Sequence, residues 1–388
     1  MELVRLHGKS RSRSADGGSL AAKKGTIGLK AFGFRLSALV LSVLMTASAA
    51  FAQEAVPAKQ LFGKITRPSK QRTAPLGFYA KGCLAGGIAI PVDGPAWQVI
   101  HLSRNRRWGT PEMIALVERL AREAKAEDGW NGLMVGDISQ PRGGPMLSGH
   151  ASHQIGLDAD IWLTPMPSHT MSYDEREVVP QASVLRSDMM RVDERKWTKS
   201  HARLIVRAAS YPRVERIFVH PGIKKKLCDT LQGSDRNLLS KIRPTYGHHY
   251  HFHIRMKCPP GAANCDDQPD PPLDSGCGTP LTEWLDRVRP RPVVKPTKPV
   301  KVAKPKHMML SALPDACAVV LKAPSVDNMA VAEFNSGATT EDAAQVPLTA
   351  YAAEPPVSAA LVAASDDFSL FLPDLRKVPE PLVRPADQ

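Results

Sequence analysis

The most constraining feature of this 388-residue sequence is the run GHHYHFHIR at residues 247–255, which holds four histidines. Side chains of a β-strand alternate between its two faces. The alternation would place His249, His251, His253 and Arg255 on one face, and Tyr250, Phe252 and Ile254 on the other. We therefore expect a strand with one apolar face in the core and one histidine-rich face at a polar site.

A second polar cluster lies upstream, in the run SGHASHQIGLDADIWL at residues 148–163. Residues 156–163 predict another strand, and the run also holds His150, His153, Asp158 and Asp160. Catalytic zinc sites use three protein ligands, from imidazole nitrogens and carboxylate oxygens, and keep a fourth position open. The residues that would supply such a set are His153, Asp160 and His253. The pattern predicts a zinc site between two strands.

The remaining periodic segments predict a mixed architecture. Residues 110–127 predict a helix capped by Thr110, with Pro111 in the first turn. Residues 199–210 predict a second amphipathic helix, and residues 214–220 predict a strand. No regular alternation of strands and helices is evident. This favours an α+β fold with an antiparallel sheet core and flanking helices.

Both ends of the sequence differ in composition from its middle. Residues 1–52 predict a signal peptide, with a basic region, an apolar stretch and an A-x-A cleavage site at residues 50–52. We therefore expect an exported, periplasmic protein that meets the membrane only transiently, through this peptide. Residues 287–307 hold eight Lys/Arg and five prolines and predict an extended basic linker. Residues 323–388 predict a disordered tail.

Six cysteines follow the predicted cleavage site, and their even number in an exported chain favours disulfides. A zinc–thiolate site is the alternative, but the sequence contains no C-x-x-C pair. Spacing alone does not choose the pairing. The net charge of +13 also raises the question of nucleic-acid binding. Export and the lack of interleaved aromatic residues argue against that class.

The runs SGHASHQIGLDADIW and GHHYHFHIRMKCP, together with the cysteine spacing, resemble the penicillin-insensitive murein endopeptidases. This family belongs to the zinc peptidases that include lysostaphin, D-alanyl-D-alanine metallopeptidases and the hedgehog signalling domain. The wider set shares His-x6-Asp and H-x-H motifs, which here are His153 to Asp160 and His251 to His253. The closer resemblance spans about residues 60–320.

The resemblance implies roles for individual residues. His153, Asp160 and His253 match zinc ligands, and His251 and His248 match catalytic histidines beside the ion. His150 and Asp188 match a second metal position, although Arg191 stands where a further ligand is expected, so one tightly bound zinc is predicted. No role is implied for His249. The implied disulfides are Cys83–Cys317, Cys228–Cys277 and Cys258–Cys265.

These roles define the expected domains and activity. A peptidase domain would span residues 53–286, and a segment at 308–322 would dock back on it through Cys317. The implied activity is a D,D-endopeptidase that cleaves D-alanyl–diamino acid cross-links of peptidoglycan by metal-activated water. Two alternatives remain open, namely a zinc D,D-carboxypeptidase acting on stem peptides and a non-catalytic wall-binding module.

Overall fold

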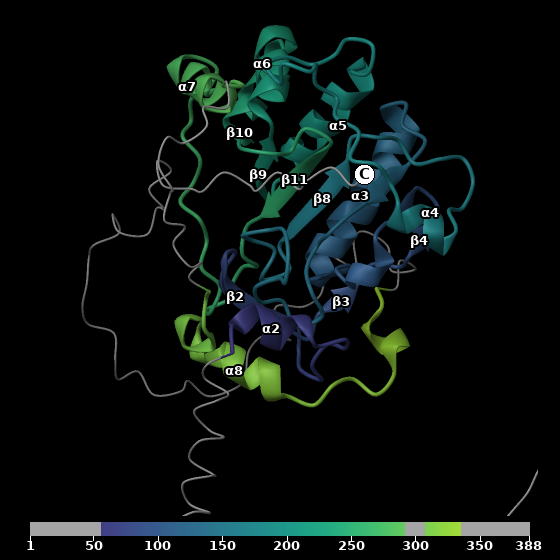
Figure 1. The fold of residues 1–388 in the computed structure, drawn as a ribbon, viewed down its shortest axis with the longest axis vertical. Coiled ribbons are helices and arrows are strands. Elements are labelled where there is room, and N and C mark those ends of the chain that lie inside the picture. Colours follow the sequence, from purple (N-terminus) through teal and green to yellow (C-terminus); the bar gives the residue numbers. More distant parts are fainter. Residues whose placement is uncertain (1–55, 292–306, 335–388) are drawn as a thin grey trace, which may run out of the picture.

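The computed structural model describes residues 56–291 and 307–334. The centre of the fold is a seven-stranded sheet with the order β10-β9-β11-β8-β7-β5-β4 (Figure 1). From one edge to the other these strands are β10 (Ile242–Pro244), β9 (Val214–Val219), β11 (His251–Met256), β8 (Asp158–Trp162), β7 (Leu133–Val135), β5 (Trp97–Val99) and β4 (Asp93–Gly94). Two small two-stranded sheets accompany it, formed by β1 (Ala74–Phe78) with β2 (Lys81–Ala85) and by β3 (Ile88–Ala89) with β6 (Trp108–Gly109).

The central four strands of the large sheet are antiparallel, as expected, but the expectation of a wholly antiparallel core is wrong at two positions. β10 pairs in parallel with β9, and β5 pairs in parallel with β7. In both cases a helix lies between the paired strands in the sequence: α6 (Pro221–Thr230) follows β9, and α3 (Pro111–Glu127) follows β5. A helical crossover returns the chain to the starting end of the sheet, which makes the two strands parallel. The three-residue strands β5, β7 and β10 are too short to show a periodic pattern.

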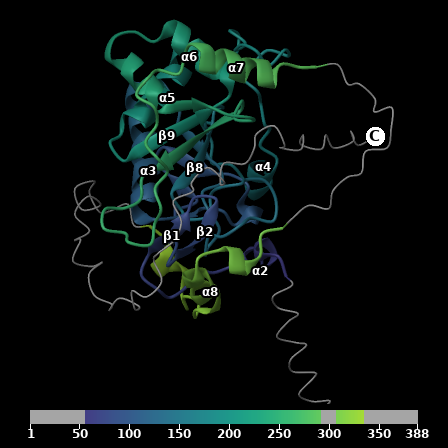
Figure 2. The same cartoon turned by 90° about the vertical axis from the view of Figure 1, so that its left-hand side faces the viewer.

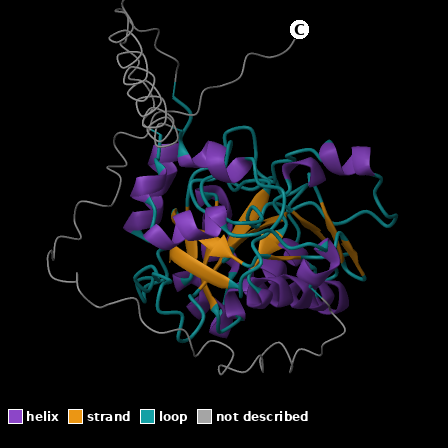
Figure 3. Cartoon of the chain, turned by 90° about the horizontal axis from the view of Figure 1, so that it is seen from below, coloured by secondary structure: helices purple, strands orange, loops and turns teal. Residues whose placement is uncertain are grey.

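The two predicted long helices are confirmed as α3 and α5 (Lys199–Ser210). Thr110 accepts a hydrogen bond from the Met113 N–H at 3.3 Å, and Pro111 occupies the first turn of α3. Apolar side chains of both helices pack in one core with alternate residues of β8 and β11. Figure 3 shows the strands in the interior with helices around them. One face of the sheet is thus closed by α3 and α5.

Most of the other helices lie toward the two ends of the molecule, whereas one of them, α4 (Tyr173–Glu177), lies at its side (Figures 1 and 2). They are α2 (Ala58–Gly63), α4, α7 (Thr279–Val288) and α8 (Asp315–Lys322), with short 3-10 helices at Leu102–Arg104 (η1), Gly233–Ser240 (η2), Leu310–Ala312 (η3) and Met329–Ala332 (η4). α6 and α7 lie at one end, and α2, α8 and the β1–β2 hairpin lie at the other. No helix within residues 56–291 and 307–334 has the length and apolar character needed to cross a bilayer.

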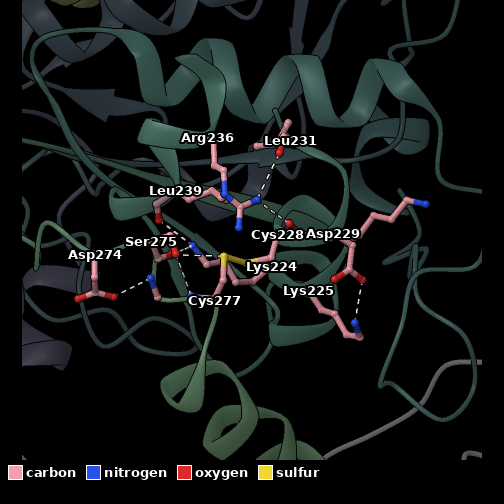
Figure 4. The surroundings of a disulfide bond; sticks show 12 residues. Lys224, Lys225, Cys228, Asp229, Leu231, Arg236, Leu239, Asp274, Ser275 and Cys277 are labelled. Carbon is pink, nitrogen blue, oxygen red and sulfur yellow. Dashed lines mark hydrogen bonds and ion pairs between the residues drawn. A yellow bond between two sulfur atoms is a disulfide. The ribbon is translucent and has the colours of Figure 1, made fainter. Parts of the chain in front are cut away.

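Three disulfides connect the chain, and they are the pairs that the resemblance implies: Cys83–Cys317, Cys228–Cys277 and Cys258–Cys265. Figure 4 shows the second of these beside Lys224. The Lys224 amine is fully buried and donates hydrogen bonds to the carbonyl oxygens of Leu239 and Ser275, each at 2.7 Å. Burial lowers the pKa of Lys224 to about 7. The disulfide therefore joins α6 to the segment around Ser275, whose carbonyl oxygen also accepts a hydrogen bond from the buried Lys224 amine.

The segment around Cys317 packs against the rest of the domain, and so do residues 324–334, which were predicted to belong to the tail. Val326 donates its backbone N–H to the Pro68 carbonyl at 3.1 Å, and Ala332 is 2% exposed. Glu333 accepts a hydrogen bond from Arg107 at 2.9 Å. The segment thus combines a backbone hydrogen bond, a side-chain ion pair and a small apolar cluster in which Ala332 packs with Ala89 and Trp108. The predicted signal peptide and the rest of the tail, and residues 292–306 of the predicted linker, lie outside the described residues.

Candidate active site

The histidine-rich run and the upstream Asp residues meet on neighbouring strands. In the antiparallel pair of β11 with β8, His253 lies opposite Asp160, and Arg255 lies opposite Asp158. Because side chains alternate along each strand, these four side chains share one face of the sheet. The intervening residues Ala159, Ile161, Phe252 and Ile254 are fully buried in the core on the other face.

Three candidate ligand atoms form a compact triangle at this face. His153 Nε2 lies 3.2 Å from His253 Nδ1, and Asp160 Oδ1 lies 3.5 Å from each of these nitrogens. Zinc–nitrogen and zinc–oxygen bonds of about 2.0–2.1 Å in tetrahedral geometry give ligand–ligand distances of about 3.3–3.4 Å. Asp160 Oδ1 is buried and has no hydrogen-bond partner among the described residues. The three atoms therefore fit one face of a tetrahedral metal site, and the unpaired, buried oxygen is compatible with a role as a metal ligand.

A hydrogen bond on the far ring nitrogen of each imidazole orients the other nitrogen toward this triangle. His153 Nδ1 lies 2.8 Å from the Ile138 carbonyl oxygen, and His253 Nε2 lies 2.8 Å from Asp158 Oδ1. Each of these nitrogens must carry the proton to donate to its oxygen, so in the neutral rings the lone pairs lie on His153 Nε2 and His253 Nδ1. Burial alone would lower the pKa of His153, but Asp160 and Asp158 outweigh it and raise that pKa to about 9. Burial lowers the pKa of His253 to about 4. In the metal-free protein the two aspartates thus favour a proton on His153, whereas His253 stays neutral.

Asp158 and Arg255 lie behind the triangle and hold its histidines in place, and the sequence predicted no role for either residue. Asp158 accepts hydrogen bonds from Arg255 Nε at 2.8 Å and from the His153 backbone N–H at 2.9 Å, in addition to its contact with His253. The Arg255 guanidinium lies 4.1 Å from the ring centre of Tyr79 and 5.1 Å from that of Phe218. The alternation of side chains along a strand could have identified both residues, because it places Asp158 on the same face as Asp160 and Arg255 on the same face as His253.

His251 lies beside the second oxygen of Asp160. Its Nε2 is 3.6 Å from Asp160 Oδ2, and its ring stacks on Trp162 at a centroid distance of 5.4 Å. Burial lowers the pKa of His251 to about 3, so the ring is neutral in the metal-free protein. Its Nδ1 has no hydrogen-bond partner within the described part of the chain.

His248 approaches from the turn before β11. Its Nδ1 donates a hydrogen bond to the Tyr246 carbonyl at 2.6 Å, which leaves Nε2 as an acceptor. A ligand atom of His248 lies within 4.8 Å of those of Asp160 and His253. His248 has a left-handed backbone, with φ of 52°, and His153 has one with φ of 66°. Such strained residues cluster at functional sites, where the surrounding structure holds them in place.

The turn at His248 also changes the expected alternation. β11 begins at His251, so the expectation that His249 shares the face of His251 and His253 is wrong. The His249 ring instead lies edge-on to His220, at a centroid distance of 6.2 Å. Tyr250 was expected in the main core, but it packs on Trp162 at 5.5 Å, in a smaller cluster.

The residues expected at a second metal position are not brought together as a ligand group. His150 joins His153 and Asp160 in one group, with His150 Nδ1 3.5 Å from Asp160 Oδ2. Asp188 belongs to neither of the two candidate ligand groups found within residues 56–291 and 307–334. It is exposed, and its carboxylate accepts the Met190 N–H at 2.9 Å. The carboxylate that forms a hydrogen bond with His150 is that of Asp137, at 2.8 Å from Nε2.

Comparisons with known proteins show the family of this chain. The profile of the penicillin-insensitive murein endopeptidase family matches residues 75–322. A protein of that name from Haemophilus influenzae is 40% identical over 296 residues, which cover 75% of this chain and 98% of the relative. Proteins of the same name from Klebsiella pneumoniae and Pectobacterium atrosepticum are 38% and 36% identical, over 61% and 65% of this chain and 86% and 89% of their own lengths. The chain therefore belongs to the penicillin-insensitive murein endopeptidase family and is a peptidase that hydrolyses peptidoglycan.

Proposed function

We propose that this peptidase is a zinc-dependent D,D-endopeptidase that hydrolyses D-alanyl–diamino acid cross-links of peptidoglycan in the periplasm. The observation that carries the zinc assignment is the triangle of His153, Asp160 and His253. Its two nitrogens are freed by hydrogen bonds on their far sides, and its buried Asp160 Oδ1 has no partner among the described residues. Two imidazoles and one carboxylate with an open fourth position are typical of catalytic zinc.

The roles of the protein groups follow from their positions. When bound, zinc supplies a Lewis acid that polarises a carbonyl and lowers the pKa of a water molecule to about 7. His251, which lies on the Oδ2 side of Asp160, is the residue that we assign to take a proton from the attacking water. The same ring would then return that proton to the leaving amine. His248 is the second candidate, because its Nε2 is also left as an acceptor.

The alternatives differ in substrate or in catalysis. A zinc D,D-carboxypeptidase would use the same ligands, and the name shared by the relatives favours the endopeptidase. A wall-binding module with structural zinc would need four closed ligand positions. The two neutral histidines beside the triangle favour a catalytic site. The proposal includes one tightly bound zinc and cross-linked peptides as substrate, and it includes no nucleic-acid partner and no lasting membrane contact. A second metal at His150 and Asp188 is not part of it.

Digestion of purified murein tests the proposal. Untreated protein should convert cross-linked muropeptide dimers into monomers, and a chelator should stop the reaction until zinc is added back. The His253→Ala variant serves as the inactive control, and elemental analysis gives the metal content. Monomers shortened by one D-alanine, with dimers unchanged, would identify a carboxypeptidase instead. Full activity in protein without any transition metal would overturn the zinc assignment.

A further inference from the structure

Next to the proposed zinc site, two arginines and a histidine share a single carboxylate oxygen. Asp137 Oδ2 lies 2.8 Å from His150 Nε2, 2.9 Å from Arg106 Nη1 and 3.4 Å from Arg104 Nη1. The Asp137 side chain is only 3% exposed and the Arg106 side chain 9%, whereas the Arg104 side chain is 35% exposed. One carboxylate balances one guanidinium, so the cluster has an excess positive charge, and its exposed member is Arg104.

The pairing of Arg104 with Asp137 is the weakest of the three contacts. A good N–H···O hydrogen bond is about 2.7–3.2 Å long, and the Arg104 contact exceeds that range. Arg106 also donates to the Ser148 carbonyl at 3.1 Å, which ties it to the loop before His150. Arg104 makes no other side-chain hydrogen bond within residues 56–291 and 307–334. Most of its five N–H donors therefore remain available to an acceptor from solution.

The backbone that carries Arg104 is held in an unusual conformation. η1 is flanked by His101 and Asn105, which are both left-handed, with φ of 54° and 51°. Ser103 donates its backbone N–H and its hydroxyl to the Glu177 carboxylate, at 2.8 and 2.6 Å. Non-glycine residues keep such conformations only where the surrounding structure determines them, and they cluster at ligand-binding sites. Arg104 is thus presented on a fixed loop.

The position of Arg104 connects it to the reaction site through one side chain. The His150 ring spans the distance: its Nε2 contacts the oxygen that Arg104 contacts, and its Nδ1 is 3.5 Å from Asp160 Oδ2. Asp137 and the His150 ring therefore lie between Arg104 and the ligand triangle, a separation that one extended substrate peptide can span.

We propose that Arg104 binds a carboxylate of the substrate peptide and so helps to select cross-linked stem peptides. This inference rests on the proposed function. The planar guanidinium presents paired N–H donors that match the two oxygens of a carboxylate. A stem peptide offers two such groups near the cross-link, a C-terminal carboxylate and a carboxylate on the diamino acid. Arg104 acts in substrate binding and not in proton transfer.

Kinetics with defined peptides test the inference. The substrates are three cross-linked peptide dimers: one with all carboxylates free, one with the C-terminal carboxylates amidated, and one with the diamino acid carboxylate amidated. We expect wild-type protein to show a KM about 10–100-fold higher for one of the amidated dimers, which identifies the bound group. Arg104→Gln should raise KM for the free dimer by a similar factor, leave kcat within about threefold, and show no further loss on that amidated dimer. Arg104→Lys keeps the positive charge but loses the paired N–H donors, so its KM for the free dimer should lie between those of wild type and Arg104→Gln.

Arg119→Gln is the matched control, because Arg119 is also an exposed arginine paired with one carboxylate, Glu123, but on α3. It should behave as wild type on all three dimers. Equal KM for all dimers in wild-type protein, or a KM unchanged by Arg104→Gln, would overturn the inference and leave the proposed function intact. If wild-type protein cleaves none of the dimers, the proposed function fails. Calorimetric binding of the same dimers then decides the role of Arg104 separately: equal binding by wild type and Arg104→Gln would overturn it.

Discussion

The two faces of β8 and β11 are both buried, but they are built on opposite principles. On the face toward α3 and α5, Phe252 and Ile161 are apolar and fully buried. On the other face, His253 and Asp160 are 4% and 1% exposed, although both are polar. Burial of apolar surface stabilises a fold, whereas burial of a charged group is costly unless it is paired. The apolar face therefore stabilises the fold. The polar face lowers that stability, because it keeps charged and polar side chains buried at the candidate site.

The largest expected difference comes from substituting adjacent residues on the two faces. His253→Ala should abolish metal binding and lower murein hydrolysis by several orders of magnitude, because it removes one of three candidate ligands. Phe252→Ala should lower the free energy of unfolding by about 3–5 kcal/mol, because it empties a fully buried site in the core. Metal content by elemental analysis and denaturant unfolding separate the two effects. Loss of metal from folded Phe252→Ala protein would show that the two faces are not independent.

The next comparison lies within the polar face, between binding and catalysis. His251→Ala should retain nearly stoichiometric zinc while the hydrolysis rate falls by about 10²–10⁴-fold, the usual effect of losing a general acid–base group. His249→Ala is the control, because His249 lies outside the ligand triangle and should change the rate little. Loss of zinc from His251→Ala would instead make His251 a ligand. Full activity would make His248 the better candidate for the base.

Asp158→Asn sharpens the role of the buried contacts behind the triangle. The substitution keeps the size of the side chain but removes its negative charge. It therefore weakens the hydrogen bond that orients His253 and the ion pair with Arg255. We expect zinc affinity to fall by about 10–100-fold, as is usual for such supporting groups. A competition titration with a chromophoric chelator measures it. An affinity equal to that of wild type would mean that the core packing alone orients His253.

The last effect, which is the smallest when it is expressed per pH unit, is a dependence of zinc affinity on pH. In apoprotein prepared with a chelator, burial opposes protonation of His153, but Asp160 and Asp158 raise its pKa to about 9. Below that pH a metal ion must displace the proton, so affinity should rise by up to about tenfold per pH unit as the pH increases toward 9, then level off. Chelator competition at several pH values, with proton release measured by calorimetry in different buffers, checks the trend. A flat affinity between pH 6 and 8, with no proton released, would contradict it.

Local patterns were sufficient for the parts of the chain whose partners are near in sequence. The helices at 110–127 and 199–210 followed from apolar spacing and capping. The alternation in residues 156–163 and 251–255 identified two strands with a polar face. In these segments, whether a residue faces the core or solvent follows from its position in the helix or strand period, so the spacing of apolar residues predicts it.

Tertiary structure alone decided how these pieces meet. The register that sets His253 opposite Asp160, the Ile138 carbonyl that orients His153 and the choice of Asp137 over Asp188 as the partner of His150 all join distant segments. The parallel outer strands and the packing of residues 324–334 are likewise long-range. The sequence by itself determined which side chains could form a metal site, because residue chemistry and local periodicity are written in it. Only the folded chain determined their distances, their tautomers and their neighbours, because these depend on contacts between residues far apart in the sequence.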